Sequence, residues 1–184
     1  RPTETALAAI RPLVGPRNIE IDREHRSIRF SHPGVELDLA GVAHGFAVEL
    51  AAASLGRRGL SGTVDAGGTQ YVVGVPLGKT HWSVGIGHPD RPGVLLAAVD
   101  VERGAVSTAS SAAGGGGSVA ASRAQPRLLD PRTLRPATAA LGATVISEDG
   151  TLAGALARAV CVLGPREGLS LLERFPRTWG VVAY

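Results

Sequence analysis

The residues best placed to do chemistry stand together near position 40, in the segment LDLAGVAHG at 37–45. Asp38 comes just before the small residues Ala40 and Gly41, and from Val42 to Leu55 the apolar side chains recur at helical spacing. The N-terminus of a helix has unpaired N–H groups and partial positive charge, so it suits an anion such as a phosphate. The same pattern also fits a tight turn from a strand into a helix, in which Asp38 caps the helix with its carboxylate.

Three later segments carry further polar groups. DAGG at 65–68 ends a predicted strand with a glycine turn, and AVSTAS at 105–110 has hydroxyls that could donate to phosphate oxygens or form a polar loop without function. In LLDPRTLRP at 128–136, Asp130 precedes a proline and is expected to shape a turn, with contact to a ligand as the alternative. Arg127 and Arg132 flank Asp130, and each could bind an anion or form a surface ion pair.

The composition indicates a chain that folds around an aliphatic core. Of its 184 residues 44% are hydrophobic and only 4% are aromatic, so Ala, Val, Leu and Ile must build that core. The net charge of +3 is too small and too dispersed for a nucleic-acid-binding protein. No apolar stretch reaches 18 residues, so no transmembrane helix is predicted. Cys161 is the single cysteine, which excludes an internal disulfide, and its apolar neighbours predict a buried side chain.

The elements that must position these residues follow from periodicity and turn signals. We predict one α+β domain over residues 1–184, with much antiparallel sheet and an N-terminal helix and hairpin within 1–34. A flexible loop is expected at 107–125, where Gly, Ser and Ala dominate. The predicted helices lie at 3–13, 42–55, 151–164 (capped near Asp149) and 165–174, and the predicted strands at 18–22, 27–30, 35–39, 62–66, 70–76, 81–87, 95–102, 143–147 and 178–184.

The order of these segments resembles the ApbE family, the FAD:protein FMN transferases. LDLAGVAHGFAVE is similar to the family segment LDLGGIAKGYAVD without a gap, and Asp65 to Gly68 match a family Asn-x-Gly-Gly. Trp82 to Pro89 match a Trp-x-Val-Gly-Ile-x-x-Pro segment, and Ala153 to Ala159 correspond to an Ala-Asp-Ala-Leu-x-Thr-Ala helix. The resemblance extends over residues 35–184 and implies an ApbE-like, T-fold-like fold of mostly antiparallel sheet packed with a few helices.

The resemblance implies a flavin-nucleotide site. Family members bind FAD and, with Mg²⁺, move its FMN half to a Thr hydroxyl of an acceptor flavoprotein, with AMP as the leaving group. Carried over residue by residue, it assigns catalytic positions to Arg127, Asp130 and Arg158, and the backbone carbonyl of Ala43 to any bound metal. The cofactor-binding positions that it implies are Asp38, Ala40, Gly41, His44, Gly45, Phe46, Asp65, Gly67, Gly68, Thr108 and Leu128.

This sequence departs from the family pattern at the predicted metal site. The helix Asp is replaced by Gly154 and the helix Thr by Arg158, so both oxygen side chains for Mg²⁺ are missing and a guanidinium could take the cation position. The motif His is Arg127, the Lys of Ala-Lys-Gly is His44, and the Gly of the Asp-Pro-Arg-Thr-Gly turn is Leu134.

Three functions therefore remain open. The chain could be an active transferase, a non-catalytic flavin-binding or accessory domain of a larger assembly, or a scaffold that serves as a protein–protein module. The resemblance implies a longer N-terminal portion than residues 1–34, so the chain could be a fragment or a minimal variant, or a partner chain could complete the pocket. The resemblance also implies a periplasmic or membrane-associated location.

Overall fold

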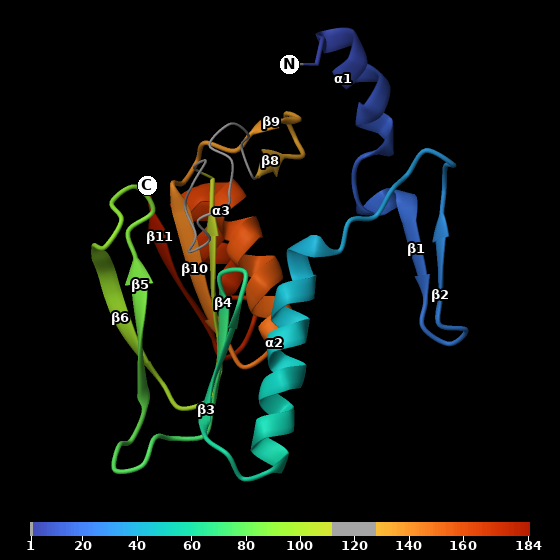
Figure 1. Ribbon diagram of the computed structural model, residues 1–184. Helices are drawn as coiled ribbons and strands as arrows, with labels where there is room; N and C mark the ends of the chain where they lie inside the picture. Colours follow the sequence, from blue (N-terminus) through green and yellow to red (C-terminus); the bar gives the residue numbers. More distant parts are fainter. Residues whose placement is uncertain (1, 112–127) are drawn as a thin grey trace. The chain divides into compact units, whose positions relative to one another are not determined.

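The computed structural model describes residues 2–111 and 128–184, which fold as two compact units. The N-terminal unit consists of Arg1–Asp38 with Leu129–Arg135, and the main unit consists of Leu39–Leu128 with Pro136–Tyr184. Figure 1 shows the elements of both units.

The N-terminal unit contains a short helix, two single turns and a hairpin. In α1 (Glu4–Ile10), the Thr3 side chain caps the helix by accepting from the Ala6 N–H at 3.2 Å. The 3₁₀ turns η1 (Arg11–Leu13) and η2 (Pro16–Asn18) lead into β1 (Ile19–Asp22), which pairs antiparallel with β2 (Ser27–Phe30). The predicted helix and hairpin are confirmed. The strand predicted at 35–39 is wrong, because these residues have no strand partner in the described part of the chain and form no regular structure.

The main unit is built on a five-stranded antiparallel sheet with the order β11-β10-β7-β4-β3 (Figure 1). This sheet confirms the predicted antiparallel character and the α+β class. Its strands are β3 (Gly62–Ala66), β4 (Thr69–Val73), β7 (Gly104–Ser110), β10 (Gly142–Ser147) and β11 (Thr178–Ala183).

Two helices cover one face of this sheet. α2 (Ala40–Arg57) packs on β3 and β4, and α3 (Gly150–Leu172) packs on β7 and β10. Asp149 caps α3 as predicted, by accepting from the Leu152 N–H at 2.7 Å. Gly164 (φ 83°) breaks the helical path before Pro165, which is why the sequence reads as two helices there.

A hairpin of β5 (Trp82–Gly87) and β6 (Leu95–Val101) packs on the other face of the sheet. Val84 and Val101 of the hairpin form a small core with Val72 and Val106 of the sheet. The main core lies between the sheet and the helices, and there Cys161 is buried as predicted. Burial raises the pKa of the Cys161 thiol. The main unit therefore has three layers, namely helices, sheet and hairpin (Figure 1).

The largest difference from the sequence prediction is β7. From the sequence, residues 105–110 are either phosphate donors or a polar loop and residues 107–125 are a flexible loop, but Gly104–Ser110 is the central strand of the sheet. The Ser107 and Thr69 hydroxyls are buried and lie 2.8 Å apart, so their hydrogen bond compensates for their loss of water. Residues 112–127 of the predicted loop lie outside the described residues. In the described ranges, no helix combines the length and the apolar character that a membrane span needs.

The turn between two very short strands agrees with its prediction. β8 (Leu129–Asp130) and β9 (Arg135–Pro136) bracket the Asp-Pro-Arg-Thr-Leu sequence, and the Leu134 N–H donates to the Asp130 carbonyl at 2.7 Å. Leu134 has a left-handed backbone (φ 59°), at the position where the family pattern has glycine.

Candidate functional site

A hollow of about 790 Å³ lies in the main unit, between the β5–β6 hairpin and the sheet. One wall comes from the hairpin and the turn after β5, including Ile86, Pro89 and Leu96, and the other comes from β7 and β10. Seven residues that the sequence assigned to the site line this space, although they come from five separate segments: His44, Asp65, Gly67, Gly68, Thr108, Leu128 and Arg158.

The glycine turn after β3 is shaped by its contact with α2. Gly67 and Gly68 both have positive φ (59° and 86°), and the Thr108 N–H donates to the Gly68 carbonyl at 2.8 Å. A Cβ on Gly67 would lie 2.7 Å from Cδ2 of His44, so the imidazole occupies the space that any other side chain would need. The turn thus brings His44 and the Gly-Gly backbone to the same side of the hollow.

Arg158 is held by two backbone carbonyls at the end of the hollow where α2 begins. Its Nη1 donates to the Gly41 carbonyl at 2.6 Å and to the Gly154 carbonyl at 3.1 Å. A Cβ on Gly154 would lie 3.4 Å from the Gly41 carbonyl oxygen and 3.9 Å from both Arg158 Nη1 and Ser107 Oγ. The position that carries Asp in the family pattern therefore faces the guanidinium of Arg158.

A pair of threonines adds hydroxyls to the wall formed by the sheet. Thr108 of β7 and Thr144 of β10 stand opposite each other, and their Oγ1 atoms are 2.9 Å apart. Both residues line the hollow, but the sequence analysis assigned only Thr108 to the site. Alternation along ATVIS places Thr144 on one face of a strand, whereas its partner across the sheet follows only from the register.

The first turn of α2 differs from its prediction. The helix begins at Ala40 instead of Val42, and Leu39 instead of Asp38 holds the N-cap position. The N–H groups of Val42 and Ala43 both donate to the Leu39 carbonyl at 3.0 Å. These two donors are therefore already hydrogen-bonded within the helix and are not left over for an anion. Arg158 contacts the carbonyl of Gly41, two residues before Ala43, to whose carbonyl the resemblance assigned a metal.

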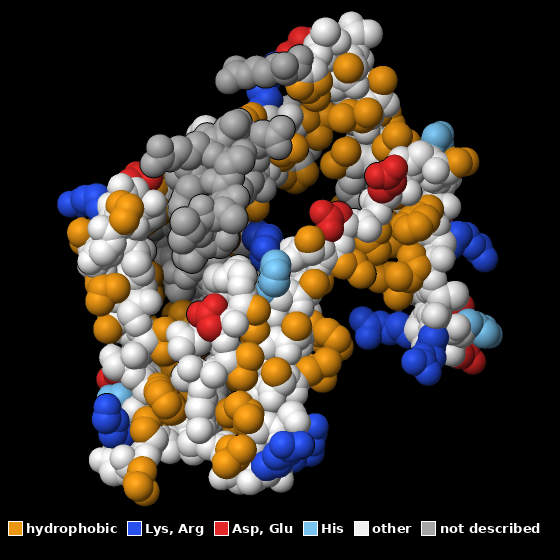
Figure 2. Space-filling view, in the orientation of Figure 1, with side chains coloured by type: hydrophobic (Ala, Val, Ile, Leu, Met, Phe, Trp, Pro, Cys, Tyr) orange, Lys and Arg blue, Asp and Glu red, His pale blue; other side chains and the backbone are white. Residues whose placement is uncertain are grey.

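Gly45 and Phe46 do not line the hollow. Gly45 is buried where α2 and α3 cross closely. A Cβ on Gly45 would lie 2.0 Å from the Gly150 carbonyl oxygen, so this crossing leaves no space for a side chain. The Phe46 side chain is 55% exposed. Hydrophobic side chains recur along the surface of the main unit around α2 in the space-filling view (Figure 2).

The remaining predicted residues belong to other parts of the chain. Asp130 lies in the N-terminal unit, where its carboxylate accepts from the Arg132 backbone N–H at 2.8 Å and from the Arg132 guanidinium at 2.9 and 3.0 Å. This hydrogen bonding lowers the pKa of Asp130, and it makes the residue a shaper of its turn, as predicted. Asp38 also belongs to the N-terminal unit, and Arg127 lies outside the described residues.

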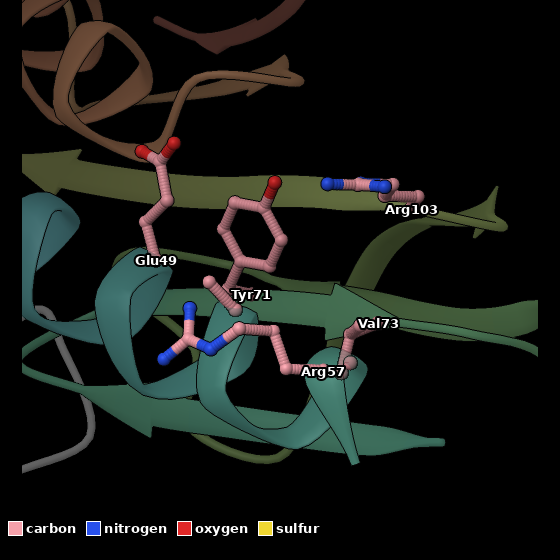
Figure 3. A pocket seen from close by; sticks show the side chains of 7 residues that line it. Glu49, Arg57, Tyr71, Val73 and Arg103 are labelled. Carbon is pink, nitrogen blue, oxygen red and sulfur yellow. The ribbon is translucent and has the colours of Figure 1, made fainter. Parts of the chain in front are cut away.

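A second, smaller hollow of about 370 Å³ lies beside α2 and β4 (Figure 3). Glu49, Arg57, Tyr71 and Arg103 line it, and Tyr71 donates its hydroxyl to the Glu148 carbonyl at 2.9 Å. None of the site residues predicted from the sequence lies there. Within residues 2–111 and 128–184, no cluster of three or more His, Cys, Asp or Glu residues could hold a metal ion.

Comparison with known proteins agrees with the resemblance. The model of a family described as "ApbE family" matches residues 1–182. An FAD:protein FMN transferase of Rhodobacter capsulatus is 33% identical over 153 residues, which is 83% of this chain and 29% of that protein. A protein of the same name from Treponema pallidum is 29% identical over 160 residues, covering 82% of this chain and 44% of that protein. The chain thus spans less than half the length of these curated relatives.

Solved structures show the same fold. The crystal structure of an ApbE protein from Thermotoga maritima has a TM-score of 0.82 at 27% identity, over 99% of this chain and 59% of that one. The flavin transferase ApbE of Vibrio cholerae has a TM-score of 0.77 at 22% identity, over 99% of this chain and 61% of that one, and it shows the fold alone. The predicted ApbE-like α+β fold is therefore confirmed.

Proposed function

Because the chain belongs to the ApbE family, we propose that it binds a flavin nucleotide in the hollow of the main unit, without the metal-dependent transfer chemistry of the family. One observation carries this proposal: seven family-motif positions, spread from residue 44 to residue 158, line a single hollow. The order of these motifs along the sequence does not by itself place their residues side by side in the fold.

The residues of the hollow fit a flavin nucleotide. Its volume lies within the range of small-molecule sites. Apolar side chains such as Ile86 and Leu96 suit the faces of an aromatic ring system, and the hydroxyls of Thr108 and Thr144 suit its polar edge. The Gly67-Gly68 turn lines the hollow beside His44 and adds backbone groups, without side chains, to its wall.

The same residues do not fit Mg²⁺ bound in the family manner. Mg²⁺ takes hard oxygen ligands, usually with one or two carboxylates from the protein. Gly154 offers no side-chain oxygen, and Arg158 brings a fixed positive charge to within 2.6 Å of the Gly41 carbonyl. The proposed function therefore includes no step that passes through a metal. When a flavin is bound, the chain's own groups hold its phosphates and ring, and the flavin supplies any redox chemistry.

A second candidate is FMN transfer itself, and the relatives named FAD:protein FMN transferase favour it. In that reaction an acceptor hydroxyl attacks the phosphorus of the FMN half, the P–O bond to the AMP half breaks, and AMP leaves with the bridging oxygen while the hydroxyl proton goes to a base. Mass spectrometry of a Thr-containing acceptor flavoprotein, incubated with the chain, FAD and Mg²⁺, tests it. An FMN adduct formed at a rate like that of the relatives would overturn the non-transferring proposal.

The exposed side chains of α2 support a role within a larger assembly. Phe46 and Leu50 are each 55% exposed, and α2 has few polar residues on any side. A helix that is apolar all round is normally covered. We propose that a partner chain packs on this helix.

Flavin binding is tested by fluorescence and absorbance titration of the purified chain with FAD. Leu96 lines the hollow, while its neighbour Leu95 does not, and both are at least 40% exposed (43% and 64%), so they form a matched pair. We expect Leu96→Glu to weaken FAD binding about tenfold or more, because it places a carboxylate against the apolar ring system of the flavin, and Leu95→Glu to leave it unchanged. No FAD binding by the unaltered chain, or equal effects of the two variants, would overturn the proposal.

A further inference from the structure

We propose that Arg158 is a built-in cation of the nucleotide site, which binds the phosphate groups and makes nucleotide binding independent of divalent ions. This inference rests on the proposed function, because it concerns the same hollow. It differs from the family's metal chemistry, since the positive charge belongs to a side chain of α3 and is present whether or not Mg²⁺ is in solution.

The first support is the way in which Arg158 is fixed. Its Nη1 donates to the carbonyl oxygens of Gly41 and Gly154, one from the first turn of α2 and one from the preceding turn of α3. Backbone carbonyls are also the groups that coordinate hard cations. The guanidinium is thus anchored by acceptors of the kind that a metal ion would use, at the junction of the two helices.

The second support is the charge around Arg158. A Cβ at Gly154 would lie 3.9 Å from Nη1, so a carboxylate at this position would be within reach of the guanidinium. Glycine at 154 contributes no such charge, and the nearby Ser107 is neutral and paired with Thr69.

The third support is the direction in which Arg158 is accessible. The residue is half-buried, contacts the first turn of α2 and also lines the hollow, together with His44 and the Gly67-Gly68 turn. A guanidinium carries five N–H donors and binds phosphate oxygens in bidentate fashion. A nucleotide in the hollow would therefore place its phosphates against a charge that is already oriented, which lowers the entropic cost of binding.

The test is a titration of the whole chain with FAD, in EDTA and again in MgCl₂, followed by fluorescence. We expect the unaltered chain to have the same dissociation constant in both buffers. Arg158→Gln is expected to weaken binding about ten- to a hundredfold, because a charged hydrogen-bond donor to the phosphates is lost. Gly154→Asp should weaken it similarly, since its carboxylate neutralises Arg158, whereas the matched Gly154→Ala should bind like the unaltered chain.

The outcomes separate this inference from the proposed function. If FAD binds only with MgCl₂, or if Arg158→Gln and Gly154→Asp bind as tightly as the unaltered chain, the flavin site stands and the inference is overturned. If FAD does not bind in either buffer, the proposed flavin function fails. Calorimetric titration with inorganic pyrophosphate in EDTA then decides the inference alone, because equal heats for the unaltered chain and Arg158→Gln would overturn it. Thermal unfolding of each variant shows that it is folded, and Gly154→Asp leaves Arg158 in place should Arg158→Gln not fold.

Discussion

Gly45 of α2 and Gly150 of α3 cross with their backbones in contact. A Cβ on Gly45 would lie 2.0 Å from the Gly150 carbonyl oxygen, and a Cβ on Gly150 would lie 2.7 Å from the Gly45 carbonyl oxygen. One turn further along α2, the Glu49 carboxylate accepts from the Gly150 N–H at 2.8 Å. This crossing fixes the start of α3 against α2, and so it sets where Arg158 of α3 can meet the carbonyl of Gly41.

Gly45→Ala should therefore destabilise the chain. The added methyl has to separate two packed helices, and overpacking of this kind costs about 3 kcal/mol of unfolding free energy. Gly41→Ala is the matched control in the same helix, because its Cβ would lie 3.5 Å from Arg158 Cδ, an ordinary contact. Urea unfolding followed by circular dichroism measures both. Equal stabilities for Gly45→Ala and the control would show that the crossing is not as tight as described.

The contact between His44 and Gly67 gives a second prediction. Gly67→Ala should weaken FAD binding and lower stability by about 2 kcal/mol, because it combines positive-φ strain with a collision against the imidazole. Gly78 has a similar backbone (φ 74°) but open space around it, so Gly78→Ala reports the strain alone. The collision accounts for the stability that Gly67→Ala loses beyond the loss in Gly78→Ala. Adding His44→Ala to Gly67→Ala removes the imidazole and should restore that part of the stability. A double variant no better than Gly67→Ala would contradict this account.

Much of the fold could be predicted from the sequence because its signals are local. Gly59 (φ 68°) ends α2 and Asp149 caps α3, as the stop and cap signals indicate. β7 could not be predicted, since a run of Ser, Thr and Ala resembles a loop until β4 and β10 pair with it on either side. For residues 35–39 the error is the reverse, a strand predicted where none forms. Their composition suits a strand, but no strand pairs with them among the described residues.

The candidate site was predictable in part, for the same reason. The family resemblance assigned Gly67, Thr108 and Arg158 to the site, and all three line the hollow. It could not identify Thr144, which depends on the β7–β10 register, nor show that Gly45 serves helix packing. A glycine that permits a ligand to approach and one that permits a helix to approach have the same appearance in a sequence.

Asp130 gives a prediction on pH. Hydrogen bonds from Arg132 lower the pKa of its carboxyl in the folded chain, whereas in the unfolded chain this pKa is about 3.9. The stabilisation is therefore fully present above about pH 4 and is lost as the pH falls through the lower, folded pKa. Asp22, whose pKa His25 lowers, acts in the same direction. Thermal midpoints from pH 6 to pH 3 should fall less steeply for Asp130→Asn than for the unaltered chain, and parallel curves would contradict the role of Asp130.

Leu134 holds the position of the family glycine in a backbone conformation that favours glycine. Its φ is 59°, and its N–H closes the turn by donating to the Asp130 carbonyl at 2.7 Å. A side chain with a Cβ costs about 1 kcal/mol in this region, so the turn keeps its shape under local strain. Leu134→Gly and Leu134→Ala both remove the half-buried leucyl side chain, and only alanine keeps the Cβ.

We therefore expect Leu134→Gly to be more stable than Leu134→Ala by about 1 kcal/mol, the reverse of the order in a helix interior, where glycine is the less stable of the two. Urea unfolding of the two variants measures the difference directly, because the lost apolar contacts are the same in both. If Leu134→Ala is as stable as Leu134→Gly or more stable, the turn does not require a left-handed backbone at this position. In that case the replacement of the family glycine by leucine would carry no conformational cost.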